Sequence, residues 1–351
     1  MNYLNSIKIK NFYSIKEIEL TNLSNKKEIY IVGENGDGKT LLLQAITIAL
    51  KGVNEGDVFN LTKSQKIETF VTFDDNKEFN LTNGEYKNLF AYGSNRSNSC
   101  KMEIDKTGYL TLFNNSLDLK TPTNLLIELY NASLHTDLKV SLDDVISIMK
   151  ALLNKEVEID VTYNNVTFKE KGSNVSFEQL SAGYKSVIII ICDLIDRLLK
   201  SQPEVKNISE YQAIVLIDEV ELHLHPKWKY NFIKTLRNIF PKIQFIITTH
   251  SPTVILGASK DAVFYKIYKK DGEINISDKI PNKGYTNNTL ISSPLFDLDT
   301  MASRKFDDNE FSSDDYICQK LHKIIKTKIK QENLFNDEEI DKLVESELSK
   351  L

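Results

Sequence analysis

The alternation of apolar and polar positions divides the first third of the chain into short strands around one helix. Apolar and polar residues alternate over 6–12 and 15–20, which predicts two strands buried on one face. The apolar run Ile29–Val32 predicts a strand covered on both faces, and Leu41–Leu50 predicts a helix. Further strands are expected at 67–73, 78–81 and 89–92, with a hairpin from Met102 to Phe113 that turns at 106–108. We therefore expect a β-rich first lobe.

Helical spacing predominates after Thr121–Thr123. Apolar residues three or four positions apart predict helices over 124–134, 141–153 and 182–199. A strand pair is expected at 157–163 and 166–169. Two further strands are expected at 213–217 and 244–248, with a crossover helix between them at 227–240. The last two strand candidates are apolar throughout, as in parallel strands covered on both faces. A further amphipathic helix is predicted over 312–331, with a lysine cluster that suits either a solvated face or a phosphate-binding patch.

These patterns predict an α/β fold with a mixed sheet, a β-rich first lobe, a helical second lobe and a helical C-terminal tail. We expect the main domain to span 1–280, with its two lobes at 1–120 and 121–280 and a C-terminal extension at 281–351. Composition is that of a soluble globular protein, with 41% hydrophobic and 26% charged residues. No apolar stretch is long enough for a membrane span and no signal peptide is evident, so a cytoplasmic protein without a membrane partner is expected.

Charge and cysteine content narrow the function classes. The net charge of −5 gives no general nucleic-acid signature, so any contact with DNA or RNA has to use a local patch or a partner. The three cysteines are far apart and show no metal-ligand spacing, which suits a reducing compartment.

The segment Gly33–Thr40, GENGDGKT, fits the phosphate-cradling pattern G-x-x-x-x-G-K-[ST] at every fixed position. It lies between the predicted strand at Ile29–Val32 and the predicted helix at Leu41–Leu50, the context that this loop requires. Its glycines let main-chain N–H groups point at phosphate oxygens, and the helix N-terminus adds partial positive charge. Lys39 would reach the β- and γ-phosphates, and the Thr40 hydroxyl would bind Mg²⁺. The predicted nucleotide-binding residues of this loop are Gly33, Asn35, Gly36, Gly38, Lys39 and Thr40.

Two further motifs follow the apolar strands of the second lobe. Asp218 and Glu219 end the strand at 213–217, where Asp218 can hold Mg²⁺ together with Thr40. Glu219 can orient a water for attack on the γ-phosphate, as a general base. His250 ends the strand at 244–248 and can hydrogen-bond to the charge that develops on the γ-phosphate.

The motif Leu180–Gly183, L-S-A-G, immediately precedes the long predicted helix. Ser181 is a natural N-cap, and free main-chain N–H groups beside Gly183 form an anion site. The chain already has one complete phosphate loop. A second anion site makes sense if it closes over the γ-phosphate that another protomer holds.

The order of these four motifs resembles the ATP-binding-cassette (ABC) ATPases over residues 1–275. By that resemblance, Gly33–Thr40 is the Walker A loop, Ser181 and Gly183 form the signature, Asp218 and Glu219 form Walker B, and His250 is the switch histidine. The resemblance implies ATP and Mg²⁺ as cofactors and a homodimer or higher homo-oligomer that sandwiches ATP. The expected glutamine of the first lobe is not evident. Asn95 and Arg96 are the candidates that could replace this glutamine at the nucleotide.

The segment Asp218–Pro226 reads D-E-V-E-L-H-L-H-P, which resembles the OLD, Septu and retron-associated ATPases of anti-phage defence. These are AAA-like heads akin to those of SMC and RecF, and the segment between Thr40 and Leu180 is too short for a long coiled coil. This resemblance implies an ATPase that controls a separate effector such as a nuclease. His223 and His225 lack a nearby third ligand, so a metal site there is not expected. Intrinsic nuclease activity is not expected either, because Asp297–Asp299 lacks the preceding Glu of an acidic cluster.

Three alternatives stay open on the sequence. A RecF-like DNA-repair ATPase would bind DNA directly, with salt-sensitive affinity. A transport cassette would need a membrane partner. A scaffold that binds ATP without hydrolysing it would not depend on Glu219.

Overall fold

A mixed sheet forms the centre of the computed structural model. Its strands follow the order β15-β14-β3-β13-β12-β6, with β16 paired to β14. The strands from β14 to β6 run parallel, whereas β15 and β16 are antiparallel to β14. Their bounds are Glu28–Val32 (β3), Leu89–Tyr92 (β6), Ile214–Ile217 (β12), Gln244–Thr249 (β13), Val263–Lys270 (β14), Glu273–Ile276 (β15) and Ile280–Pro281 (β16).

The structure describes residues 3–296 with gaps at 53–57, 59–66, 95, 97–102, 136–138, 154–156, 171, 283, 285–289, 291–292 and 294. Residues 1–298 form one compact unit. The predicted tail helix at 312–331 lies outside the described residues, and the domain boundary at 280 stays a prediction.

Both faces of the central sheet are buried at β3, β12 and β13, whose residues are mostly apolar and buried at every position. In β3, Ile29 and Ile31 pack into the core around α1 (Lys39–Lys51), whereas Tyr30 and Val32 pack into the core of the helical lobe. The same alternation runs along β12 and β13. Continuous apolar runs therefore predicted central strands correctly.

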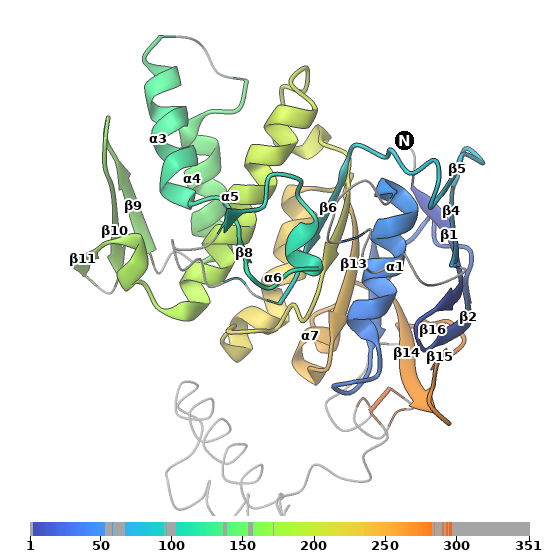
Figure 1. Ribbon diagram of the computed structural model, residues 1–351. Helices are drawn as coiled ribbons and strands as arrows, with labels where there is room; N and C mark the ends of the chain where they lie inside the picture. Colours follow the sequence, from blue (N-terminus) through green and yellow to red (C-terminus); the bar gives the residue numbers. More distant parts are fainter. Residues whose placement is uncertain are drawn as a thin grey trace, which may run out of the picture. The chain divides into compact units, whose positions relative to one another are not determined.

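The first lobe adds an antiparallel sheet of order β2-β1-β4-β5. Its strands span Leu4–Phe12 (β1), Ile15–Leu20 (β2), Glu68–Phe73 (β4) and Glu78–Asn80 (β5). Their alternating apolar residues face α1, which packs between this sheet and the central one. The β-rich first lobe expected from the sequence is confirmed (Figure 1).

The helical lobe covers the opposite face of the central sheet. Its elements are α3 (Pro122–Ser133), α4 (Leu142–Leu152), α5 (Ala182–Ser201), α6 (Pro226–Ile239) and α7 (Pro252–Leu256). It also holds the sheet β11-β10-β9, at Ser173–Val175, Val166–Glu170 and Val157–Val161, and the 3₁₀ turns Phe177–Gln179 and Ile208–Glu210. The Ser141 side chain caps α4 and accepts a hydrogen bond from the Asp144 N–H at 3.1 Å. Figure 1 shows α3, α4 and β9–β11 on the side away from β1 and β2.

The hairpin predicted at 102–113 is wrong. Met102 lies outside the described residues, and Glu103–Ile104 (β7) pairs in parallel with Leu117–Asp118 (β8). The Asp105 carboxylate accepts hydrogen bonds from the N–H groups of Thr107, Gly108 and Thr111. These bonds fold the segment into a turn followed by the 3₁₀ helix Leu110–Leu112, because a local side chain supplies the acceptors that a second strand would have supplied.

Among the described residues, no helix is both long and apolar enough to cross a membrane. The predicted α/β class with a mixed sheet, a β-rich lobe and a helical lobe is confirmed.

Candidate functional site: a phosphate loop beside an acidic strand end

The phosphate loop connects the end of β3 to the start of α1, as the motif predicted. Gly38 has a φ of +94°, and a Cβ there would lie 2.3 Å from Cδ1 of Ile274. Lys39 is buried, and its ammonium donates to the carbonyls of Gly33 and Glu34 at 2.9 and 2.8 Å. These bonds hold the lysine within the loop whose N–H groups a phosphate would meet.

Asp218 lies at the carboxyl end of β12, beside the loop. Its Oδ2 accepts a hydrogen bond from the Thr40 hydroxyl at 2.7 Å, and its Oδ1 accepts one from the Thr248 hydroxyl at 2.5 Å. Thr248 Oγ1 in turn accepts from the Glu219 N–H at 2.7 Å. The structure therefore brings together Thr40, Asp218 and Glu219, and Thr248 of β13 is the link that sequence reasoning missed.

The oxygen atoms of Thr40 and Asp218 fit a Mg²⁺ ion. They are a hydroxyl and a carboxylate, the hard ligands that Mg²⁺ prefers, and they lie at the first turn of α1 and at the carboxyl end of β12. No group of three or more His, Cys, Asp or Glu side chains suited to a metal occurs in the described part of the chain. The fit is thus to a Mg²⁺ ion that takes its other ligands from phosphate and water.

Glu219 adopts a left-handed backbone conformation, with φ of +45°. Such a conformation is rare outside glycine and is costly unless the surroundings impose it. Its side chain is partly exposed, and no hydrogen bond or ion pair to its carboxylate is recorded among the residues described. Glu219 therefore presents a carboxylate that no residue in the described part of the chain occupies.

His250 follows β13 directly, and its side chain is 48% exposed. Its Nδ1 lies 3.0 Å from Oε1 of Glu221, and its main-chain N–H donates to the same oxygen at 2.7 Å. Sequence reasoning did not single out Glu221. The feature of the sequence that could have identified Glu221 is its place as the second Glu of D-E-V-E, two positions after Glu219.

Arg96 is buried directly behind the acidic strand end. Its guanidinium donates to the main-chain carbonyls of Gly93, Asp218 and Glu219. Burial lowers the pKa of Arg96 to about 10, and the charges of Asp218, Glu221 and Glu219 oppose this shift, so the group is still protonated at neutral pH. Arg96 holds the backbone that carries Asp218 and Glu219, and its predicted role as a stand-in for the first-lobe glutamine stays a prediction. Asn95 lies outside the described residues.

Ser181 occupies the N-cap position of α5, as predicted, but its side chain makes no capping hydrogen bond. Ser181 is exposed. Gly183 lies against the turn before α6, where an added Cβ would be 2.8 Å from the carbonyl oxygen of His223 and 3.1 Å from the Trp228 ring. The motif L-S-A-G and the H-L-H-P segment therefore pack on each other.

His223 and His225 are both exposed. The Nδ1 atom of His225 accepts a hydrogen bond from the Lys227 N–H at 3.3 Å, so His225 is the N-cap of α6. Asp297–Asp299 lies outside the described residues.

A cleft of about 670 Å³ lies beside the phosphate loop. It is lined by the first residues of that loop, by His250, and by Lys266, Tyr268 and Lys269 of β14. This volume is typical of small-molecule pockets, and the two lysines give it positive charge.

Comparison with known proteins agrees with these motifs. Residues 119–255 match the AAA ATPase domain family. The chain is 28% identical to Septu protein PtuA of Bacillus mycoides (strain KBAB4) over 337 residues, which cover 85% of this chain and 45% of that protein. It is 36% identical to the Retron Ec83 probable ATPase of Escherichia coli over 180 residues, which cover 51% of this chain and 31% of that protein. The chain thus spans less than half the length of these relatives.

Among solved structures, an Smc head domain from Pyrococcus furiosus, bound to the C-terminal domain of ScpA, matches 80% of this chain and 97% of its own. The TM-score is 0.48 and the identity 12%. By these sequence matches the chain is similar to the AAA ATPase domain family and to the Septu and retron ATPases, in agreement with its phosphate loop.

Proposed function

We propose that the chain binds and hydrolyses ATP between two protomers, and that this nucleotide-dependent dimer controls a separate effector in anti-phage defence. The observation that carries the catalytic part is the chain of contacts from Thr40 through Asp218 and Thr248 to Glu219. It joins the phosphate loop to the backbone of Glu219, whose carboxylate no described protein group occupies. The defence role and the effector, such as a nuclease, rest on the resemblance to the Septu and retron ATPases.

Each residue has a distinct part in this proposal. Main-chain N–H groups from Gly33 to Gly38 and the Lys39 ammonium would bind the β- and γ-phosphates. Thr40 and Asp218 would hold Mg²⁺, which neutralises charge on the phosphate oxygens. Glu219 would orient the attacking water and take its proton.

The second protomer would supply the signature. Ser181 is exposed and its hydroxyl is not used as a helix cap, while the first N–H groups of α5 lie next to it. A helix N-terminus with a free hydroxyl favours an anion. The γ-phosphate bound to Lys39 of one protomer is the anion that we assign to Ser181 and Gly183 of the other.

Replacement of Glu219 by Gln tests this function. Gln is nearly isosteric but cannot accept the proton of water, so we expect kcat to fall by roughly 100-fold or more, with little change in ATP affinity. With Mg²⁺ and ATP, Glu219→Gln should remain a dimer in light scattering after size exclusion, because ATP persists in the interface. Lys39→Ala should stay monomeric.

The outcome separates the alternatives. If Glu219→Gln hydrolyses ATP as fast as the wild-type chain, Glu219 is not the base. If ATP does not change the molecular mass that light scattering gives for the wild-type chain or for Glu219→Gln, the proposed ATP-sandwiched dimer is wrong. Fluorescence anisotropy with labelled DNA at several salt concentrations tests the RecF-like alternative, which requires steep loss of DNA affinity as salt rises.

A further inference from the structure

Glu221 is a buried carboxylate with unequal surroundings at its two oxygens. The residue is 3% exposed. Oε1 lies 2.7 Å from the main-chain nitrogen of His250 and 3.0 Å from its Nδ1. Oε2 is buried and has no hydrogen-bond partner among the described residues. Both of the described contacts of Glu221 Oε1 are therefore with His250.

The turn after β12 aims Glu221 at the end of β13. The left-handed Glu219 reverses the chain, and the N–H groups of Leu222 and Leu224 donate to the carbonyls of Glu219 and Glu221 at 3.0 Å each. Glu219 and Glu221 consequently differ in exposure. Glu219 is partly exposed at the strand end, and Glu221 is buried beneath His250.

A carboxylate at this position carries a cost in stability. Burial of a charge is unfavourable unless hydrogen bonds and opposite charge compensate it, and Oε2 has no described hydrogen bond. Arg96 compensates part of this charge, because its guanidinium interacts with Asp218, Glu219 and Glu221 together. An apolar side chain would fill the site without this cost, so packing alone does not explain a glutamate here.

We propose that Glu221 is a positioning residue that fixes the ring orientation and the tautomer of His250. Its Oε1 accepts the Nδ1 proton as well as the main-chain N–H, which leaves Nε2 as the nitrogen that faces a ligand. His250 lines the cleft beside the phosphate loop, and with Nδ1 at Glu221 the nitrogen left for a ligand there is Nε2. The inference rests on the proposed ATPase function only for the identity of that ligand.

The two glutamates then have separate tasks. Glu219 acts on the attacking water, whereas Glu221 acts only through His250 and touches neither water nor nucleotide. The carboxylate–imidazole arrangement matches the way in which a second group orients a reactive histidine in other enzymes.

The first test reads the tautomer directly. The full chain labelled with ¹⁵N-histidine is examined by long-range ¹H–¹⁵N spectroscopy at an alkaline pH at which the imidazole is neutral, and His250→Asn assigns its signals. We expect the proton on Nδ1 in the wild-type chain. In Glu221→Gln we expect this preference to be lost, while the signals of His135, on α3's C-terminal side, stay unchanged. A wild-type His250 that carries its proton on Nε2 overturns the proposal, whether or not the chain hydrolyses ATP.

The second test asks whether Glu221 acts through His250. We expect Glu221→Gln to lower kcat roughly 10- to 100-fold with an unchanged KM for ATP. The double variant Glu221→Gln/His250→Asn should be no slower than His250→Asn alone, because the orienting group has nothing left to orient. Multiplicative losses in the double variant contradict the proposal.

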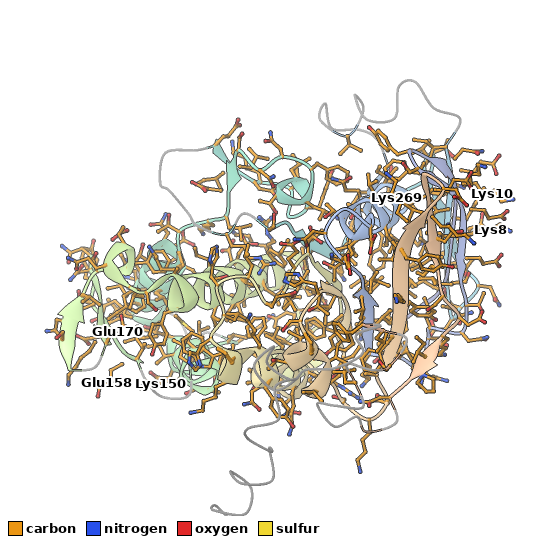
Figure 2. The ribbon with its side chains drawn as sticks, turned by 90° about the horizontal axis from the view of Figure 1, so that it is seen from below. Lys8, Lys10, Lys150, Glu158, Glu170 and Lys269 are labelled. Carbon is orange, nitrogen blue, oxygen red and sulfur yellow. The ribbon has the colours of Figure 1, made fainter. Side chains whose placement is uncertain are left out.

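Glu158→Gln is the matched control, since it removes an exposed carboxylate that pairs with Lys169 on the outer three-stranded sheet. Figure 2 shows Glu158 far from Lys269, which lines the cleft. Its kcat should equal that of the wild-type chain. If the wild-type chain has no ATPase activity, the proposed function fails, and the tautomer measurement still decides the role of Glu221.

Discussion

At the scale of single residues, the acidic strand end is held by buried groups that lie behind it. Arg96 holds the carbonyls of Asp218 and Glu219, and the Thr248 hydroxyl connects the carboxylate of one to the N–H of the other. These bonds impose the unusual φ of Glu219. The site therefore depends on residues that hold the backbone as well as on those that face the cleft.

Arg96→Lys tests this backbone support. Lysine lacks the planar guanidinium that reaches three carbonyls at once, so we expect the free energy of unfolding to fall by roughly 2–3 kcal/mol. Urea denaturation measures the change. Lys169→Arg, in the exposed pair with Glu158, is the control and should stay within about 0.5 kcal/mol of the wild-type chain. Equal stabilities of the two variants would show that the Arg96 bonds are dispensable.

At the scale of elements, α1 carries the phosphate loop at its first turn and a half-buried lysine at its last. The Lys51 ammonium donates to the carbonyl of Lys87 at 3.1 Å and lies 5.6 Å from the centre of the Tyr109 ring. Burial lowers the pKa of Lys51 to about 8, and the charge of Arg197 lowers it further. The charged form of Lys51 at the C-terminal end of α1 is therefore unfavourable for folding.

Lys51→Met tests that cost through its pH dependence. Between pH 8 and about 10.5 the unfolded chain keeps the Lys51 proton that the folded chain releases. The wild-type free energy of unfolding therefore gains from Lys51 as pH rises through this window, and at pH 7 the charged group costs about 2 kcal/mol. Lys51→Met should be the more stable chain at pH 7, with an advantage that shrinks by pH 9.5 in urea denaturation. A constant difference at both pH values argues against a lowered pKa.

At the scale of the whole molecule, one buried side chain connects the first lobe to the central sheet. The Gln244 amide of β13 accepts from the N–H of Leu4 and donates to the carbonyls of Leu4, Leu23 and Lys26. Gln244 is completely buried. The two lobes therefore share a polar contact in addition to the apolar core around α1.

Gln244→Leu removes this connection. Leu4, Leu23 and Lys26 would lose buried hydrogen bonds, so we expect the free energy of unfolding to fall by roughly 3 kcal/mol. Hydrogen exchange should accelerate most at the amides of β1, because that strand loses its attachment to β13. Gln212→Ala, at an exposed position, serves as control. Unchanged exchange in β1 would show that apolar packing alone joins the lobes.

Local patterns predicted the elements well where neighbouring residues decide them. The phosphate loop, the apolar strands β12 and β13 and the helix α5 lie within a few residues of their predicted bounds. The hairpin at 102–113 failed because the Asp105 carboxylate takes the N–H groups that strand pairing would need. A side chain that competes with backbone pairing leaves no mark on the alternation of apolar and polar positions.

The sequence by itself determined the chemistry of the parts, since glycine spacing, Lys39 and Thr40 specify a phosphate loop wherever a strand leads into a helix. It also indicated that β3, β12 and β13 are central strands, because continuous apolar runs are typical of strands covered on both faces. Only the tertiary structure decided the partners: Thr248 with Asp218, Arg96 with the backbone at Glu219, and Glu221 with His250. These pairs are far apart along the chain or lie across a strained turn, and they meet because the parallel strands β6, β12 and β13 end at one edge of the sheet.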